Sequence, residues 1–274
     1  MNRITDHQLG AIELQLSETD RRILNTLRLF RYAKTNQIQR LYYTQNITLR
    51  GKLVAASRTL NRLKKHGLVD RLPNRFRGWG AGTTGMIWYL TEAGARLLDL
   101  GHQGDRKRGR YLEPSSAFIR HTIAVSECYV QIMEICRMSP SLRIGKLHVE
   151  PECWRSYQKD GKTVSLRPDL YAETVNGQFE DRWFIEMDLD TESPNDIVEK
   201  CRRYQHYYQT RKEQEVSGVF PIVLWIVPTE ERKAKMIDAI RFNFGNRYPH
   251  MNLIITPNEL WTVITEGARK EDLC

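Results

Sequence analysis

The sequence predicts a protein of mixed class, with an α+β domain followed by an α/β domain. The chain of 274 residues is long enough for two domains that each bury a core. Apolar residues recur at helical spacing in some segments and form short strand-like runs in others. Residues 1–112 hold 21 Lys and Arg against 8 Asp and Glu (net +13), whereas the remainder holds 21 against 25 (net −4). This asymmetry indicates that one part meets a polyanion and the other has a different task.

Composition excludes several other classes of protein. The hydrophobic fraction of 41% and the charged fraction of 27% are typical of a globular protein, and no apolar run approaches the roughly 18 residues of a membrane span. The first residues lack the apolar core of a secretory signal, which favours a cytoplasmic location. The five cysteines are odd in number and never spaced as CxxC, which argues against a disulfide framework and a thiolate zinc site.

The basic part begins with three predicted helices. Ser17 is a cap-like residue before the amphipathic segment ETDRRILNTLRLF, and Thr35 starts a short second helix. A third helix is expected from about Arg50 to His66, ending at Gly67. Two strand-like segments, GLVDRLPNRF and GMIWYLTE, then flank the glycine-rich tip RGWGAGTTG, and TEAGARLLDL begins another helix.

Three helices followed by a β-hairpin is the order of a winged helix-turn-helix, and SRTLNRLKKHGLVDRL resembles the recognition helix and first wing strand of that family. The resemblance implies that the third helix reads base edges in the major groove while wing cations contact phosphates. The alternative is that these cations only solvate an exposed face. The candidate DNA-binding residues are Lys52, Ser57, Arg58, Asn61, Arg62, Lys65, Arg71, Arg75 and Arg77.

We predict a winged-helix DNA-binding domain over residues 1–100 and a linker over 101–116, which contains three glycines and the cationic run RKRGR. The second domain is predicted over 117–274. Its first element is a long helix, AFIRHTIAVSECYVQIMEIC.

Strands and helices then alternate along the second domain. Strands are expected around KLHVEPECW, TVSLRPDLYAET and DRWFIEMDLD, with SYQKDGK between the first two as a turn. A helix from Asp196 to about Arg211, the strand PIVLWIVP, the helix EERKAKMIDAIRFNF and the strand NLIIT follow. This order resembles the restriction-endonuclease-like, or PD-(D/E)xK, fold, in which helices cover both faces of a central sheet.

Acidic residues gather where the sheet's chemistry is expected. Pro168-Asp169 in one strand and Glu186 in the next resemble the PD and E-x-K elements of that fold. Strand side chains alternate, so Glu186 and Asp188 share a face and can approach Asp169. Three carboxylates that close would repel one another without a cation, and hard oxygen ligands suit Mg²⁺ or Mn²⁺. We therefore expect a metal site; the alternative is a solvated strand end, which is how we interpret Asp190 and Glu192.

Asp188 stands where E-x-K would have its lysine. The resemblance implies that a lysine on a helix replaces it, and Lys200 is the candidate, with Tyr204 four residues on along the same helix face. Glu127, on an otherwise apolar stripe of the first helix, is a candidate outer metal ligand; the alternative is an exposed helix edge.

An N-terminal winged helix combined with RPDLYAET, FIEMDLDTES and EKCRRYQHYY resembles the replication-relaxation family, which includes the MobC-type plasmid relaxases. The resemblance implies nicking of double-stranded DNA at a transfer or replication origin, with other mobilisation or replication proteins as partners. No histidine pair is spaced as His-x-His, which disfavours the metal cluster of more familiar relaxases. The residues that the resemblance assigns to the site are Asp169, Glu186, Asp188, Thr191, Lys200 and Tyr204.

Two functions follow from these observations. The first is a metal-dependent, site-specific DNA endonuclease of the relaxase type, with water or Tyr204 as the nucleophile. The second is a non-catalytic DNA-binding regulator or replication accessory that retains a degenerate nuclease-like domain as a scaffold. The missing lysine at position 188 keeps the second alternative open.

Overall fold

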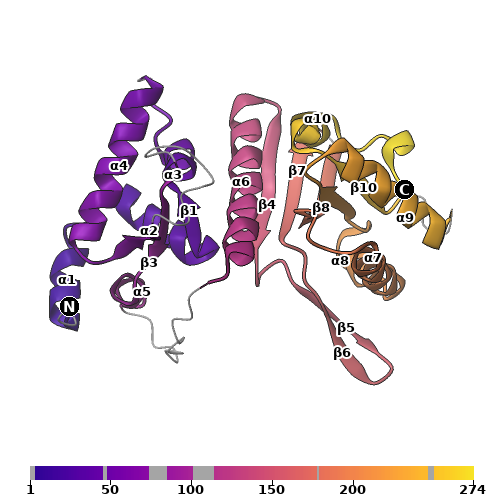
Figure 1. The fold of residues 1–274 in the computed structure, drawn as a ribbon, viewed down its shortest axis with the longest axis horizontal. Helices are drawn as coiled ribbons and strands as arrows, with labels where there is room; N and C mark the ends of the chain where they lie inside the picture. The colour runs from indigo at the N-terminus through magenta and orange to yellow at the C-terminus, as the bar shows by residue number, and fades with distance from the viewer. Residues whose placement is uncertain (1–3, 46–47, 74–84, 101–113, 178, 246–249) are drawn as a thin grey trace. The chain divides into compact units, whose positions relative to one another are not determined.

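The computed structural model describes residues 4–45, 48–73, 85–100, 114–177, 179–245 and 250–274 (Figure 1). The chain divides into two compact units, Met1–Val130 and Gln131–Cys274. Both units combine helices with strands, which confirms the mixed class predicted from the sequence. Within the described ranges, no helix has both the length and the apolar composition needed to cross a membrane.

The first unit begins with four helices, and their ends follow local capping signals. The Ser17 hydroxyl accepts from the Asp20 backbone N–H, and the Asp20 carboxylate accepts from the Ser17 backbone N–H at 2.9 Å. The Thr48 hydroxyl caps the fourth helix by accepting from Gly51. The sequence did not predict the first helix. The helices are α1 (Asp6–Glu13), α2 (Glu18–Phe30), α3 (Thr35–Tyr42) and α4 (Leu49–Lys65).

A small antiparallel sheet completes this arrangement, with the strand order β1-β3-β2. Leu27, Leu60, Leu63 and Trp88 are fully buried between the helices and this sheet. Arg75 and Arg77 of the expected wing, and the cationic run of the linker, lie outside the described residues. The strands are β1 (Tyr32–Lys34), β2 (Val69–Arg71) and β3 (Ile87–Leu90), and α5 (Glu92–Leu98) follows them.

The long helix α6 (Ser116–Met138) contributes to both units. Ile119 and Ile123 are buried with Tyr32 and Ile87 of the first unit. The Gln37 side chain also donates to the Ile123 carbonyl at 3.2 Å. The sequence placed this helix wholly in the second domain, whereas its N-terminal part packs with the first unit.

The second unit is built on a five-stranded mixed sheet with the order β10-β9-β8-β7-β4. β4, β7 and β8 pair in antiparallel fashion, and β8, β9 and β10 pair in parallel. Alternate residues of β8 point to opposite faces, and Trp183, Phe184 and Ile185 are all fully buried, so both faces of this strand are covered. The strands are β4 (Leu142–Val149), β7 (Leu170–Asn176), β8 (Phe179–Met187), β9 (Ile222–Ile226) and β10 (Asn252–Ile255).

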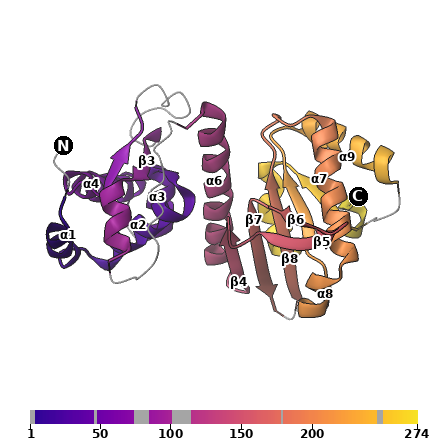
Figure 2. The ribbon, with the colours of Figure 1, turned by 90° about the horizontal axis from the view of Figure 1, so that it is seen from below.

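Two helices, α7 (Pro194–Gln209) and α9 (Glu230–Phe244), lie together on one face of this sheet (Figure 2). Ser193 caps α7, and Pro194 occupies the first helical turn, where its missing N–H costs nothing. The remaining helical segments are α8 (Lys212–Ser217), the 3₁₀ turn Pro257–Glu259, α10 (Leu260–Glu266) and the 3₁₀ turn Lys270–Asp272.

The segment between β4 and β7 differs from the expectation. The predicted turn SYQKDGK belongs to a separate antiparallel hairpin made of β5 (Arg155–Lys159) and β6 (Lys162–Leu166). The expected single strand TVSLRPDLYAET is therefore split between β6 and β7. Pro168 lacks a backbone donor and favours a break in strand pairing, so Asp169 lies just before β7 and not within a strand.

Candidate functional site

Asp169 and Glu186 come together at one edge of the sheet. Asp169 immediately precedes β7, and its backbone N–H donates to the Ile185 carbonyl at 3.0 Å. The Asp169 carboxylate in turn accepts from the Met187 backbone N–H at 2.8 Å. Because β7 and β8 run antiparallel, the start of β7 and the end of β8 meet at this edge. The strand pairing therefore fixes Asp169 beside Glu186.

Glu186 is a buried carboxylate that is held from α7. Its side chain accepts from the Tyr204 hydroxyl at 2.6 Å and from the Lys200 ammonium at 3.3 Å. Lys200 and Tyr204 lie one turn apart on α7 and so face the strand together. The structure thus brings Asp169, Glu186, Lys200 and Tyr204 into one cluster.

Burial and charge shift the acid–base behaviour of this cluster. Burial, together with the nearby Asp169 carboxylate, raises the pKa of Glu186 to about 7, although Lys200 and the Tyr204 hydroxyl oppose the shift. Burial alone would lower the pKa of Lys200, but the Glu186 and Glu192 carboxylates raise it above its usual value. Burial also raises the pKa of Tyr204 well above its usual value, and Glu186 adds to this effect.

Glu192 belongs to the cluster, although the sequence placed it in a solvated loop. Its Oε1 accepts from Lys200 at 2.7 Å, so Lys200 bridges Glu186 and Glu192. Its Oε2 is buried and has no hydrogen-bond partner within the described part of the chain. A buried carboxylate oxygen without a protein donor normally needs a water or a cation as its partner.

Asp188 follows the end of β8 and is directed to a different partner. Its buried carboxylate accepts from Arg232 Nε of α9 at 2.6 Å and from the Asp190 backbone N–H at 3.0 Å. Arg232 also pairs with Asp190 at 3.2 Å and donates to the Glu192 carbonyl at 2.8 Å. The three predicted acids therefore do not converge: Asp169 and Glu186 lie together, while Asp188 is paired with Arg232.

Arg232 was not among the candidates. It occupies the first turn of α9, in the charged run EERKAK, where the sequence indicates only a solvated helix start. Its side chain is nevertheless 9% exposed. The hydrogen bond to Asp188 raises the pKa of Arg232, and the charges of Asp188 and Asp190 act in the same direction. The sequence around Arg232 does not indicate burial, and only the contact with Asp188 in the folded structure identifies this arginine as part of the site.

The remaining metal candidate, Glu127, lies in the first unit on α6. Its carboxylate accepts from Gln37 Nε2 at 3.0 Å and pairs closely with Arg40. These contacts join α6 to α3. Thr191, which the family resemblance associated with the site, is exposed in the loop before α7.

The DNA-binding candidates on α4 differ in their surroundings. Arg58 and Lys65 are exposed. Arg62 donates to the fully buried Asp20 at 2.6 and 2.8 Å, and Asn61 donates to the Ser57 carbonyl at 2.8 Å. Lys52 and Ser57 are half-buried on the same helix, and Arg71 is exposed at the end of β2.

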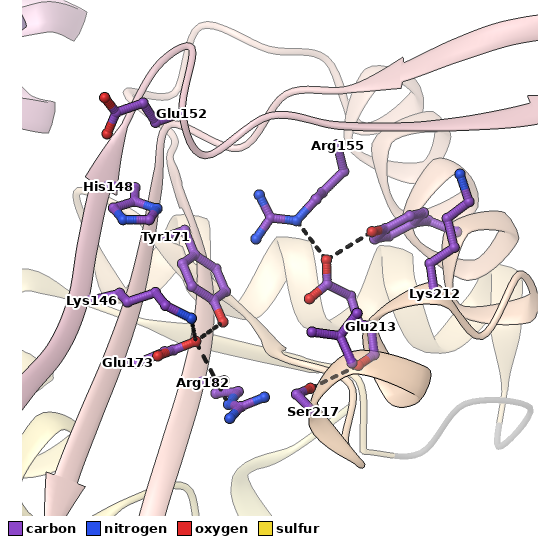
Figure 3. A pocket seen from close by; sticks show the side chains of 12 residues that line it. Lys146, His148, Glu152, Arg155, Tyr171, Glu173, Arg182, Lys212, Glu213 and Ser217 are labelled. Atoms are coloured by element: carbon purple, nitrogen blue, oxygen red, sulfur yellow. Dashed lines mark hydrogen bonds and ion pairs between the residues drawn. The ribbon is translucent and has the colours of Figure 1, made fainter.

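A cavity of about 430 Å³ lies further along the same sheet face (Figure 3). On one wall, Glu173 accepts from the Tyr171 hydroxyl at 2.6 Å and from Lys146 at 3.1 Å. On the other, Glu213 accepts from Arg155 Nε at 2.5 Å and from the Tyr207 hydroxyl at 2.7 Å. Protein groups donate hydrogen bonds to both carboxylates, so these contacts hold α8 and the base of the β5–β6 hairpin in place.

The donor set at the strand ends is suited to Mg²⁺ or Mn²⁺. Mg²⁺ in nucleic-acid enzymes is usually bound by one or two carboxylates, completed by water and substrate phosphates. Asp169 and Glu186 supply such a pair, and the orphaned oxygen of Glu192 lies on the other side of Lys200. Over the described residues, no three metal-ligating side chains form a complete protein cage.

The protein therefore consists of two units that each contain helices and strands. The second unit carries a cluster of carboxylates and a lysine where the start of β7 meets the end of β8. Comparison with family models gives the more particular assignment. Residues 24–223 match the model described as Replication-relaxation, and the chain belongs to that family, as its motifs indicated. Membership associates it with plasmid replication and mobilisation. No curated protein and no solved structure matched the chain.

Proposed function

We propose that the chain is a metal-dependent DNA-nicking protein that opens one strand at a transfer or replication origin. The observation that carries the proposal is the buried Glu186 carboxylate, held by Lys200 and Tyr204 beside Asp169. Burying a carboxylate raises its pKa at a cost in stability, and such groups cluster at functional sites. Family membership supports DNA as the substrate.

In this proposal the first unit is a winged helix that chooses the DNA site. The helices α2, α3 and α4 are followed by the paired strands β2 and β3, which is the order that a winged helix requires. Arg58 and Lys65 lie on the exposed side of α4, opposite the buried Leu60 and Leu63. This helix would enter the major groove.

In the second unit, Asp169 and Glu186 would hold Mg²⁺ or Mn²⁺, which supplies an activated water and charge neutralisation at the scissile phosphate. Lys200 neutralises part of the acidic charge and favours the ionised form of Glu186, against the effect of burial. Tyr204 fixes the orientation of Glu186 through its hydroxyl. Its full burial and raised pKa disfavour Tyr204 as the nucleophile, so water is the attacking group.

Tyr204→Phe tests the choice of nucleophile. Its hydroxyl stabilises the ionised form of Glu186, so the variant should raise the pKa of Glu186 and move the nicking profile to higher pH. At pH 9 the rate should lie within about tenfold of the wild-type rate, since Glu186 is then largely ionised in both proteins. The measurement is the rate of nicking of supercoiled origin DNA between pH 6 and 9.

Tyr207→Phe is the matched control for this experiment, because Tyr207 donates to Glu213 outside the site. It should leave the pH profile unchanged. A complete loss of nicking by Tyr204→Phe at every pH, in a folded protein, would identify Tyr204 as the nucleophile and refute attack by water.

Arg58→Ala combined with Lys65→Ala tests the winged-helix assignment. Both side chains are exposed, so the double variant should fold normally and lose two phosphate or base contacts. The slope of log affinity against log salt should fall by about 2, since each contact releases about 0.9 counterion. The measurement is fluorescence anisotropy with origin and unrelated duplexes at several salt concentrations.

Arg62→Ala is the informative comparison, because Arg62 is the cation paired with the buried Asp20. It should lower the melting temperature, whereas the Arg58 and Lys65 double variant should not. If the salt slope of the double variant equals that of the wild type, these α4 side chains do not contact DNA.

The second candidate function is a DNA-binding regulator that retains the second unit only as a scaffold. The pairing of Asp188 with Arg232, which removes one expected ligand, favours it. Incubation of supercoiled origin DNA with the chain, with and without Mg²⁺ or Mn²⁺, separates the two. Nicking that requires the metal supports the first, and origin binding without nicking supports the second.

A further inference from the structure

The second unit carries its positive charge unevenly. Residues 131–274 hold 20 Lys and Arg against 23 Asp and Glu, a net of −3. Two segments, residues 155–167 and residues 199–212, hold nine of those cations and only two of the acids. The first segment contains the β5–β6 hairpin, and the second runs from the middle of α7 to the start of α8. An otherwise acidic unit therefore has one strongly basic part.

The two segments lie side by side. Tyr157 of β5 packs against Tyr207 of α7, with ring centroids 5.8 Å apart. The Lys159 ammonium lies 3.2 Å from the ring nitrogens of His206, also on α7. Lys212 donates to the Ser156 carbonyl at 3.0 Å. The hairpin and the helices thus form one continuous surface, which we call the hairpin surface.

Of the exposed cations on the hairpin surface, Arg202 alone pairs with a carboxylate, that of Glu199, within the described residues. None of six exposed side chains on it has a carboxylate partner among the described residues; they are Lys159, Lys162, Arg167, Arg203, Arg211 and Lys212. By contrast, Arg232 and Lys233, which lie elsewhere in the same unit, are paired with acids. Uncompensated cations gathered on one surface are the electrostatic signature of a polyanion-binding site.

The hairpin is anchored firmly enough to present these cations. Arg155 at its base is bonded to Glu213, donates to the Cys153 carbonyl at 3.0 Å and lies 4.8 Å from the Tyr171 ring centroid (Figure 3). Tyr157 and Leu166 are buried. A surface whose supporting residues are already fixed loses little conformational entropy when it binds.

The hairpin surface leads directly to the candidate site. β6 ends at Leu166, and Asp169 follows three residues later. Cys153, just before β5, donates its thiol to the Pro168 carbonyl at 3.0 Å. Both ends of the hairpin are therefore fixed beside the acid that precedes β7.

We propose that the hairpin surface binds the phosphate backbone of the DNA that flanks the cleavage position. This inference rests on the proposed function and adds a second DNA contact, distinct from the α4 surface of the first unit. The β5–β6 hairpin has no large exposed hydrophobic side chain, and among the described residues the α7 part of the surface adds one, Tyr208, which is 40% exposed. A surface with so few apolar anchors favours DNA over an acidic protein. Each cation that meets a phosphate releases condensed counterions and contributes to affinity without reading sequence.

The test is a triple variant, Lys159→Gln, Lys162→Gln and Arg203→Gln, in the full chain. These side chains are exposed, so the fold should be preserved and the melting temperature unchanged. Affinity for duplex DNA is measured by anisotropy in EDTA, which prevents cleavage, across a range of salt concentrations. We expect the salt slope to fall by about 2 to 3 and the affinity at 0.1 M salt to weaken at least about tenfold.

The control variant removes the same charge from elsewhere in the unit, as Arg143→Gln, Arg241→Gln and Lys270→Gln, all of which are exposed. It should change the slope by less than about 1. A slope for the hairpin variant equal to that of the wild type, or an equal loss in the control, overturns the inference. Failure of the wild-type chain to bind DNA at all would instead refute the proposed function, so the two failures can be told apart.

Discussion

Asp169→Asn and Glu186→Gln are each expected to slow origin nicking by at least about a hundredfold while leaving DNA binding nearly unchanged. Even residues that only support a metal ligand typically account for ten- to a hundredfold in activity. Asp169 and Glu186 lie at the strand ends, whereas the proposed binding surfaces lie on α4 and on the hairpin. The measurements are the single-turnover rate on supercoiled origin DNA and, separately, the affinity for the same site in EDTA.

Glu199→Gln is the matched control, because Glu199 lies one residue before Lys200 on α7 but is exposed and paired only with Arg202. It should nick at the wild-type rate. A double variant of Asp169 and Glu186 that still nicks at the wild-type rate would show that these residues are not the cleavage site.

The raised pKa of Glu186 adds a readout that does not depend on cleavage. In the unfolded chain a glutamate ionises near pH 4.3, whereas burial raises the pKa of Glu186 to about 7. Between these values only the folded protein keeps the proton, so the metal-free wild type should lose up to about 4 kcal/mol of stability as pH rises. Glu186→Gln should lack this loss. Mg²⁺ binds the ionised form and should stabilise the wild type more at pH 8 than at pH 6.

Part of the site cluster could be predicted from the family resemblance together with short-range periodicities. The alternation of β8 places Phe184 and Glu186 on one face, and the four-residue spacing of Lys200 and Tyr204 places both on one face of α7. The capping residue Ser17 located the start of α2, whereas the sequence placed the start of α7 at Asp196, two residues after its first residue, Pro194. These features depend on local geometry, and local geometry can be worked out from the order of residues.

Other features depend on contacts between distant segments, which no local pattern specifies. The partner of Asp188 is Arg232, 44 residues away on another helix. The hairpin was interpreted as a turn because Asp160-Gly161 is a strong turn signal, while its strands alternate exposed and buried residues only weakly. The division of α6 between two units likewise depends on which surfaces cover Ile119 and Ile123.

Arg232→Met is expected to destabilise the chain by about 3–5 kcal/mol, measured by urea denaturation at pH 7. The Asp188 side chain is 1% exposed and that of Arg232 is 9% exposed, so removing the cation leaves a buried carboxylate without its counter-charge. Adding Asp188→Asn to Arg232→Met should recover much of this loss, because the uncompensated charge is then removed as well. Asp188→Asn alone should cost less, since Arg232 keeps its contacts with Asp190 and the Glu192 carbonyl.

These variants also decide what Asp188 does. If Asp188 serves to hold the loop that carries Glu192, its substitution should weaken nicking in proportion to the stability lost, and Mg²⁺ should protect Arg232→Met no more than it protects the wild type. If Asp188 is a metal ligand, Asp188→Asn should abolish nicking in a protein of nearly normal stability. Mg²⁺ should then stabilise Arg232→Met more than it stabilises the wild type, because the metal replaces the lost cation. The 2.6 Å pairing of Arg232 with Asp188 favours the first outcome, because a guanidinium already bonds one oxygen of this carboxylate and the Asp190 N–H bonds the other.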